Sequence, residues 1–137
     1  MSVVKSKRGE SELSIITKSR ELASYTIIIC SNEKNFPKRY RWCITNNIVN
    51  DALNIYAYIR KSNAIFVKFK VDYSERRKYQ NNALGTIDSL LGNMDIAYAT
   101  FGIDDNRINH WVGLVVEVQK FLRNWMKSDL ERYKDLV

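Results

Sequence analysis

A short stretch that follows the only proline of the chain alternates basic with aromatic side chains: Lys38, Arg39 and Arg41 with Tyr40 and Trp42. We expect it in the first turn of a helix, where backbone N–H groups are free and the dipole is already positive. Cations are unfavourable there unless an anion binds, and an exposed ring stacks on nucleic-acid bases. The stretch predicts a site for phosphate or an acidic partner. The alternative is a solvated basic turn whose rings point into the core.

Further basic pairs extend this candidate site along the chain. Arg60 and Lys61 lie later in the same predicted helix, and Arg76 and Arg77 lie in the first turns of the next one. We include all four as candidate residues for binding nucleic acid or a polymerase. Because Glu75 is adjacent to Arg76, the alternative for the second pair is a salt bridge within the bundle or between subunits.

The charge of the chain is concentrated in two segments. The chain has 22 Lys and Arg residues against 15 Asp and Glu residues, which gives a net charge of +7. Residues 1–11 carry three basic residues against one acidic, and residues 36–69 carry six against one; the remainder is balanced. An excess of this kind predicts an acidic partner, such as nucleic acid, an anionic surface or an acidic protein.

Residues that commonly perform catalysis are scarce. The chain has a single histidine, His110, and it lacks the common motifs for nucleotide binding, serine hydrolysis and metalloproteolysis. Asp104 and Asp105 are best explained as a helix cap. We therefore predict no enzyme activity, no catalytic residue, no metal and no cofactor; the alternative is an enzyme whose site is assembled between subunits. Cys30 and Cys43 are predicted to be buried free thiols, with a disulfide as the alternative.

Apolar residues recur at helical spacing in four segments, at about 12–32, 36–64, 72–101 and 105–128. Short connections between helices of this length predict an all-α fold, an antiparallel up-down four-helix bundle. We expect a flexible basic tail over residues 1–11, the bundle over 12–130 and a charged tail over 131–137. The ambiguous run 65–71 is interpreted as an apolar linker laid against the bundle, because a lone strand would have no partner.

Local signals mark several helix ends. Ser11 is the predicted N-cap of the first helix, and Asp72 with Glu75 is similar to a capping box. Gly102 fits the position that follows the end of the third helix. The chain has no secretory signal and no apolar run long enough to span a membrane, so we predict a cytoplasmic protein without a membrane partner.

Five short motifs together resemble one protein family. They are Phe36-Pro37-Lys38-Arg39-Tyr40-Arg41, then Ala52-Leu53 with Ile55 and Ile59, then Arg76-Arg77 with Gln80 and Ala83, then Trp111 with Leu114, and finally Trp125 with Lys127-Ser128-Asp129. In order and spacing, they resemble the four-helix-bundle proteins called accessory variability determinants (Avd) of diversity-generating retroelements. A related branch is encoded in intervening sequences of 23S ribosomal RNA genes.

The resemblance implies a non-enzymatic homopentamer that binds the reverse transcriptase of the element and its template-repeat RNA or cDNA. Such a protein supports mutagenic reverse transcription of a target gene. It implies that Lys38, Arg39 and Arg41 contact the polymerase or nucleic acid. The alternative is an intervening-sequence-type bundle protein of unknown role, acting as an oligomeric binding module. The chain also has more aromatic residues than one small bundle needs inside, which favours an oligomer.

Overall fold

The computed structural model describes residues 7–136, with side chains from Ser14 onward. Its elements in chain order are α1 (Lys7–Ser31), the 3-10 turn η2 (Lys38–Tyr40), the π-helical turn η3 (Arg41–Thr45), α2 (Asn46–Ala64), α3 (Lys70–Phe101) and α4 (Asp105–Tyr133). Within this range the chain forms four α-helices and no strand, so the predicted all-α class is confirmed.

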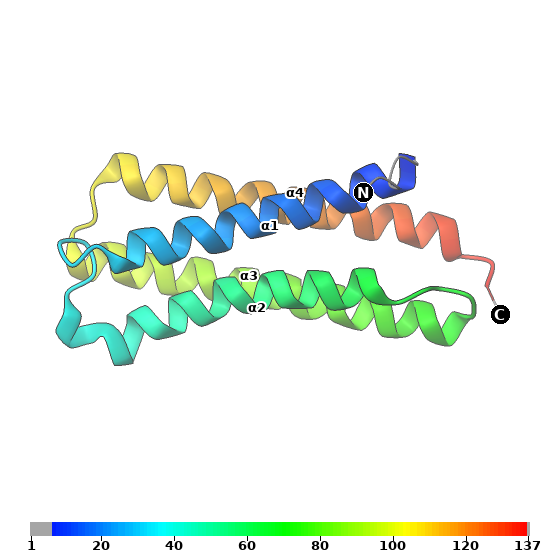
Figure 1. Ribbon diagram of the computed structural model, residues 1–137, viewed down its shortest axis with the longest axis horizontal. Helices are drawn as coiled ribbons and strands as arrows, with labels where there is room; N and C mark the ends of the chain where they lie inside the picture. Colours follow the sequence, from blue (N-terminus) through cyan, green and yellow to red (C-terminus); the bar gives the residue numbers. More distant parts are fainter. Residues whose placement is uncertain (1–6, 137) are drawn as a thin grey trace.

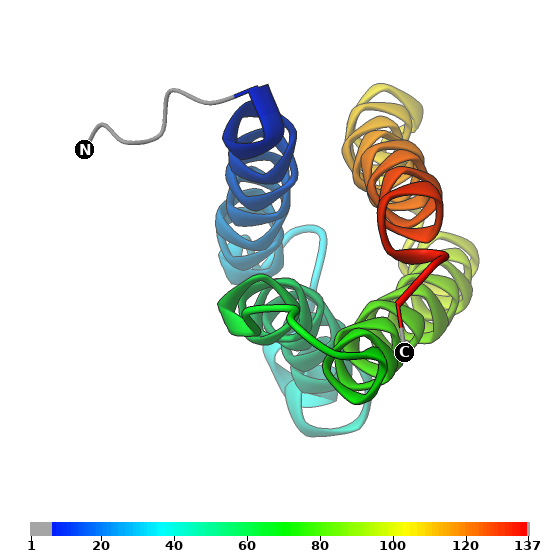
Figure 2. The same cartoon turned by 90° about the vertical axis from the view of Figure 1, so that its right-hand side faces the viewer.

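The helices lie lengthwise beside one another, and their connections alternate between the two ends of the molecule (Figure 1). α2 packs against α1 and α3, and α4 packs against α3 and α1. Viewed end-on, the four helices surround a common centre (Figure 2). No helix in the described range combines the length and apolar composition needed to cross a membrane.

One apolar core runs between the helices. Its largest fully buried members include Ile15, Leu22, Phe36, Ile48, Ile55, Ile59, Ile87, Leu90, Met94, Trp111 and Leu122. On α2, α3 and α4 these residues recur at steps of three and four, so each of these helices turns one apolar stripe inward. The burial of this stripe is the main stabilising contribution to the fold.

α1 begins earlier than its sequence pattern predicts. The helix starts at Lys7, so Ser11 lies inside it and is not its N-cap. Residues 7–11 of the predicted tail are therefore helical, while residues 1–6 lie outside the described range. The helix ends at Ser31, close to the predicted end.

The beginning of the second helix differs most from the prediction. In place of one helix from Phe36, the chain forms the 3-10 turn η2 and the π-helical turn η3, and regular α-helix starts only at Asn46. Phe36 is buried, with edge-on contacts to the rings of Phe101 and Trp111 at centroid distances of 5.7 and 5.9 Å. Anchoring Phe36 in the core fixes the path of the chain before the α-helix can begin.

The connection between α2 and α3 contains no helix or strand, as predicted for a linker. Ile65 and Val67 are half-buried, but Phe66 and Phe69 are exposed, so the linker is only partly laid against the bundle. α3 starts at Lys70, and Asp72 is the third residue of the helix, not its N-cap. The carboxylate of Asp72 accepts hydrogen bonds from the backbone N–H groups of Lys68 (3.1 Å) and Phe69 (2.9 Å).

The predicted caps around Gly102 and Asp104 are confirmed. Gly102 has φ +66°, the left-handed conformation that glycine adopts most easily, and its N–H donates to the carbonyl of Tyr98 at 3.1 Å. Asp104 accepts from the N–H of Arg107 at 3.1 Å. α4 continues to Tyr133, so residues 131–133 of the predicted charged tail are part of this helix.

Candidate functional site

The predicted basic and aromatic stretch forms one surface, which we call the turn cluster: Lys38, Arg39, Tyr40, Arg41 and Trp42. Tyr40 packs on Phe101 with ring centroids 5.5 Å apart, and the Arg39 guanidinium lies 5.1 Å from the centre of the Tyr40 ring. Trp42 is 78% exposed. The alternative in which both rings point into the core is wrong for Trp42, whose face is open to a partner.

The cations of the turn cluster lack acidic neighbours. No Asp or Glu occurs between Lys34 and Asn50. Within the described residues, neither Lys38, Arg39 nor Arg41 makes an ion pair. Like charges this close repel one another, and an anionic partner would relieve that repulsion.

The expected phosphate site at an α-helix N-terminus is not formed by this stretch. Regular α-helix begins after Thr45, and the N–H of Asn46 already donates to the carbonyl of Arg41 across the π-helical turn. The cations of the turn cluster therefore act through their side chains, and the α-helix dipole does not assist them there.

Arg60 and Lys61 lie near the end of α2, Lys68 lies in the α2–α3 connection, and Lys70 and Lys78 lie in the first turns of α3; we call these five residues the hairpin cluster. The Lys61 ammonium lies 5.8 Å from the centre of the Tyr58 ring and 5.9 Å from that of Tyr79. α2 is about 28 Å long at 1.5 Å per residue. The turn and hairpin clusters thus occupy opposite ends of the molecule and do not form a single site (Figure 1).

Arg76 has its side chain in the interior. It is 4% exposed, and its guanidinium donates to Asp129, which is fully buried, at 2.8 and 3.3 Å. The predicted salt bridge within the bundle therefore exists, but its acidic partner is Asp129 and not Glu75. With its guanidinium held in this way, we do not retain Arg76 in the candidate surface.

Arg77 is half-buried and bridges two helices. Its guanidinium donates to the backbone carbonyl of Met126 on α4 at 2.7 Å and to the Tyr73 hydroxyl. The bond to Met126 joins the start of α3 to α4, and the bond to Tyr73 lies within α3. The hydrogen bonds of Arg77 therefore serve mainly to hold the helices together. Its half-buried guanidinium is less accessible to a partner than the exposed cations of the turn cluster are.

Two exposed features were not foreseen from the sequence. Phe66 and Phe69 of the α2–α3 connection are 78% and 53% exposed, and the Lys68 ammonium lies 5.6 Å from the centre of the Phe69 ring. Lys120, Arg123 and Lys127 line the exposed side of α4. Counting charge by segment concealed this stripe, because the acidic residues that balance it include the buried Asp129 and the distant Asp104 and Asp105.

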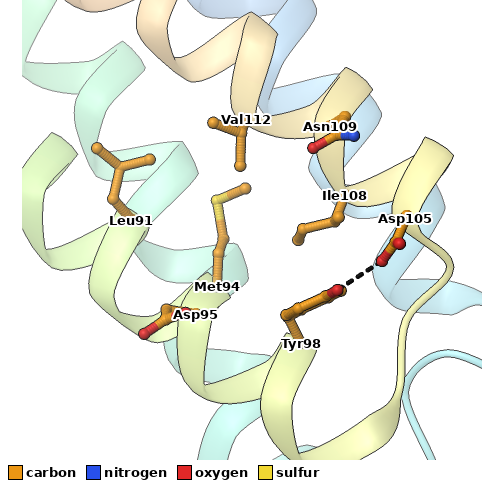
Figure 3. Close-up of a pocket in the computed structure, with 8 residues that line it drawn as sticks. All are labelled: Leu91, Met94, Asp95, Tyr98, Asp105, Ile108, Asn109 and Val112. Carbon is orange, nitrogen blue, oxygen red and sulfur yellow. Dashed lines mark hydrogen bonds between the residues drawn. The ribbon is translucent and has the colours of Figure 1, made fainter.

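A groove of about 360 Å³ lies between α3 and α4 (Figure 3). Leu91, Met94, Ile108 and Val112 form its apolar part, and the Tyr98 hydroxyl donates to the Asp105 carboxylate at one end. The hydrogen bond to Asp105, with its negative charge, raises the pKa of Tyr98. Tyr98 therefore stays protonated at neutral pH, and none of the predicted site residues lines this groove.

The residues considered for catalysis are dispersed. His110 is exposed and makes an edge-on ring contact with Tyr25, with centroids 4.9 Å apart. Asp104 caps α4, and Asp105 is bonded to Tyr98. In the part of the chain that the structure covers, no group of three or more His, Cys, Asp or Glu residues is arranged to hold a metal ion.

The two cysteines are free, as predicted, but only Cys30 is buried; Cys43, next to Trp42, is exposed.

Comparison with models of known families, with characterised proteins and with solved structures finds no match for this chain.

Proposed function

We propose that this chain is a non-enzymatic accessory protein of a diversity-generating retroelement. It binds the reverse transcriptase and template RNA or cDNA in the cytoplasm and supports mutagenic reverse transcription. The observation that carries the proposal is the turn cluster, whose cations make no ion pair with any other described residue and whose indole is 78% exposed. The motif resemblance gives the identity of the partners.

The chemistry of the turn cluster suits an acidic macromolecule. Lys38 and Arg39 are exposed, Arg41 is half-exposed, and no acidic side chain lies in the stretch that holds them. Arginine pairs with a phosphate or carboxylate through two parallel N–H bonds, and Trp42 offers a flat apolar face beside them. Both a polymerase surface and a single-stranded nucleic acid present groups of this kind.

The proposal includes an antiparallel up-down bundle that assembles as a homopentamer. The alternating connections support the antiparallel arrangement (Figure 1). Assembly is supported by large apolar side chains that the single chain leaves exposed, among them Ile28, Ile96 and Leu130. Association of copies would bury this apolar surface and gain free energy from it.

The test is co-purification with the reverse transcriptase encoded beside the gene of this protein. The triple variant Lys38→Gln, Arg39→Gln, Arg41→Gln is compared with Lys120→Gln, Arg123→Gln, Lys127→Gln, which removes the same charge from the exposed side of α4. We expect the turn variant to lose association by about 10-fold or more, because charged hydrogen bonds contribute strongly. The α4 variant should bind as the unchanged protein does.

Two results would contradict the proposal. One is the absence of a neighbouring reverse transcriptase gene, which would leave the intervening-sequence type of bundle protein as the better description. The other is equal loss of association in both variants, because net charge alone would then explain binding.

A further inference from the structure

Three large apolar side chains are exposed within one short stretch, in the α2–α3 connection and the first turn of α3. Phe66 is 78% exposed, Phe69 is 53% exposed and Val71 is 71% exposed; we call these three residues the apolar tip. The connection lies at the end of the bundle opposite to the turn cluster (Figure 1). Large apolar side chains gathered on an exposed surface mark a place of contact with a protein or a membrane.

The backbone of the apolar tip is held by hydrogen bonds, but the Phe69 ring contributes nothing to them. The carbonyl of Phe69 accepts from the N–H groups of Asp72 at 3.0 Å and Tyr73 at 3.2 Å. Phe69 is the N-cap residue of α3 and makes no side-chain capping hydrogen bond. Ser, Thr, Asn and Asp stabilise a helix from this position, whereas an apolar side chain does not. The exposed ring therefore serves neither the core nor the helix.

The apolar tip lies among cations. All five residues of the hairpin cluster are exposed, and none of them makes an ion pair with another described residue. The acidic residues of the range 60–78 are Asp72, whose carboxylate is bonded to backbone N–H groups of the connection, and Glu75. At the adjoining end of α4, Glu131 is paired with Lys134. Apolar surface and an excess of positive charge therefore occur together.

This combination matches the surface of an anionic bilayer. Anionic headgroups attract lysine and arginine, and the boundary between headgroups and acyl chains takes up apolar side chains. The long stems of Lys68 and Lys70 allow their ammonium groups to stay among the headgroups while the neighbouring apolar side chains enter. A single-stranded nucleic acid fits less well, because Val71 has no ring on which a base could stack.

We propose that the apolar tip and the hairpin cluster dock this protein on an anionic lipid surface. Phe66, Phe69 and Val71 enter the boundary between headgroups and acyl chains, and the five cations pair with anionic groups of the lipid. A contact of this kind needs no membrane-spanning helix, and it would replace the prediction of a protein without a membrane partner. It goes beyond the proposed function, because none of its residues belongs to the turn cluster.

The test is co-sedimentation of the full chain with vesicles of phosphatidylcholine that contain about 30% phosphatidylserine. Binding to vesicles of phosphatidylcholine alone should be weaker by about 10-fold or more, because the attraction of the cations is lost. Phe66→Ser with Phe69→Ser should weaken binding to the anionic vesicles by about 10- to 100-fold. The matched control, Leu53→Ser with Val116→Ser, removes two exposed apolar side chains from α2 and α4 and should change the affinity by less than about 2-fold.

The cations are tested in the same way. Lys68→Gln with Lys70→Gln should weaken binding to the anionic vesicles by about 10-fold or more. Lys120→Gln with Arg123→Gln removes the same charge from the exposed side of α4 and should weaken binding by less than about 3-fold. Phe69→Ser alone supplies a favourable N-cap, so its melting temperature should equal or exceed that of the unchanged protein while its vesicle binding falls.

Three results would overturn the proposal. The first is an unchanged protein that does not bind the anionic vesicles, and the second is a control pair that weakens binding as much as its matched pair. The third is a Phe66→Ser, Phe69→Ser variant that binds the vesicles normally but loses affinity for single-stranded RNA or sediments as a smaller species. The apolar tip would then contact nucleic acid or a second copy of the chain.

Failure of the proposed function gives a different result. A protein that binds the anionic vesicles but does not co-purify with the reverse transcriptase would contradict the proposed function and leave the lipid contact standing.

Discussion

A single buried carboxylate organises the polar side chains near the end of α4. Asp129 accepts from Arg76, from the amide of Gln80 at 2.9 Å and from Arg132 at 3.2 Å. The Arg76 guanidinium also lies 4.9 Å from the centre of the Trp125 ring. Moving an ion pair out of water costs free energy. The pair is therefore favourable only when the other hydrogen-bonding positions of both side chains are satisfied as well.

Removing the charge of Asp129 should therefore strongly destabilise the protein. Asp129→Asn keeps the shape of the side chain but removes the negative charge that the buried Arg76 guanidinium contacts at 2.8 Å. We expect the free energy of unfolding to fall by about 3–5 kcal/mol, measured by urea denaturation. The control is Glu131→Gln, which breaks an exposed pair with Lys134 and should cost less than about 1 kcal/mol. Equal losses in the two variants would show that burial of the Arg76–Asp129 pair has no special weight.

The two thiols should differ sharply in reactivity. Burial raises the pKa of Cys30 to about 12, so at pH 8 its thiol is protonated as well as shielded. Cys43 is exposed. With a thiol reagent such as Ellman's reagent, we expect one thiol to react in the folded protein and the second only after unfolding. As the pH rises toward 12, the protection that comes from protonation is lost and only shielding remains. Rapid reaction of both thiols in the folded protein at pH 8 would contradict the burial of Cys30.

At the level of elements, apolar periodicity predicted the inward stripes well wherever the buried residues are apolar. Ile48, Ala52, Ile55 and Ile59 on α2 follow the pattern. On α1 the buried stripe includes Ser19 and Thr26, while Ile27 is exposed. The hydroxyls of Ser19 and Thr26 donate to backbone carbonyls of their own helix, which makes their burial acceptable. Hydrophobicity alone cannot reveal such positions.

The sequence did not predict the interrupted start of α2, for a different reason. The residues from Phe36 to Thr45 have helical spacing, but burial of Phe36 against Phe101 and Trp111 requires another path of the chain. Those contacts join residues distant in sequence. Local propensity does not contain them, so the 3-10 and π-helical turns appear only in the folded structure.

Two glycines, one at a helix end and one inside a helix, provide a prediction in which the same substitution has opposite effects on stability. Gly102 has φ +66°, so Gly102→Ala places a Cβ atom in a strained conformation and should destabilise the protein by about 1–2 kcal/mol. Gly113 lies inside α4 with open space around it, so Gly113→Ala should stabilise by about 0.5–1 kcal/mol. Chemical denaturation of both variants measures the two effects. A stabilising Gly102→Ala would mean that this helix does not end in the left-handed conformation.

For the whole molecule, the sequence predicted the residues of the candidate surface better than their arrangement. Lys38 to Trp42 lie together, as their adjacency in sequence requires. Arg60 and Lys61 belong to the same predicted helix but lie at its other end, and Arg76 is buried against a residue 53 positions away. Pairing across the bundle decides which cations remain exposed, and net charge gives no information about that pairing.

Two separated basic ends allow the proposed contact with nucleic acid to be assigned by its salt dependence. For a single strand, the slope of log affinity against log salt is about −0.7 per neutralised phosphate. If the turn cluster makes the contact, Lys38→Gln, Arg39→Gln, Arg41→Gln should reduce the magnitude of the slope by about 2. The same number of substitutions in the hairpin cluster, Arg60→Gln, Lys61→Gln, Lys68→Gln, should leave the slope nearly unchanged. Fluorescence anisotropy of a labelled RNA between about 50 and 200 mM salt measures both slopes. The reverse pattern would place the nucleic acid at the hairpin cluster, in the part of the chain that also holds the exposed Phe66 and Phe69.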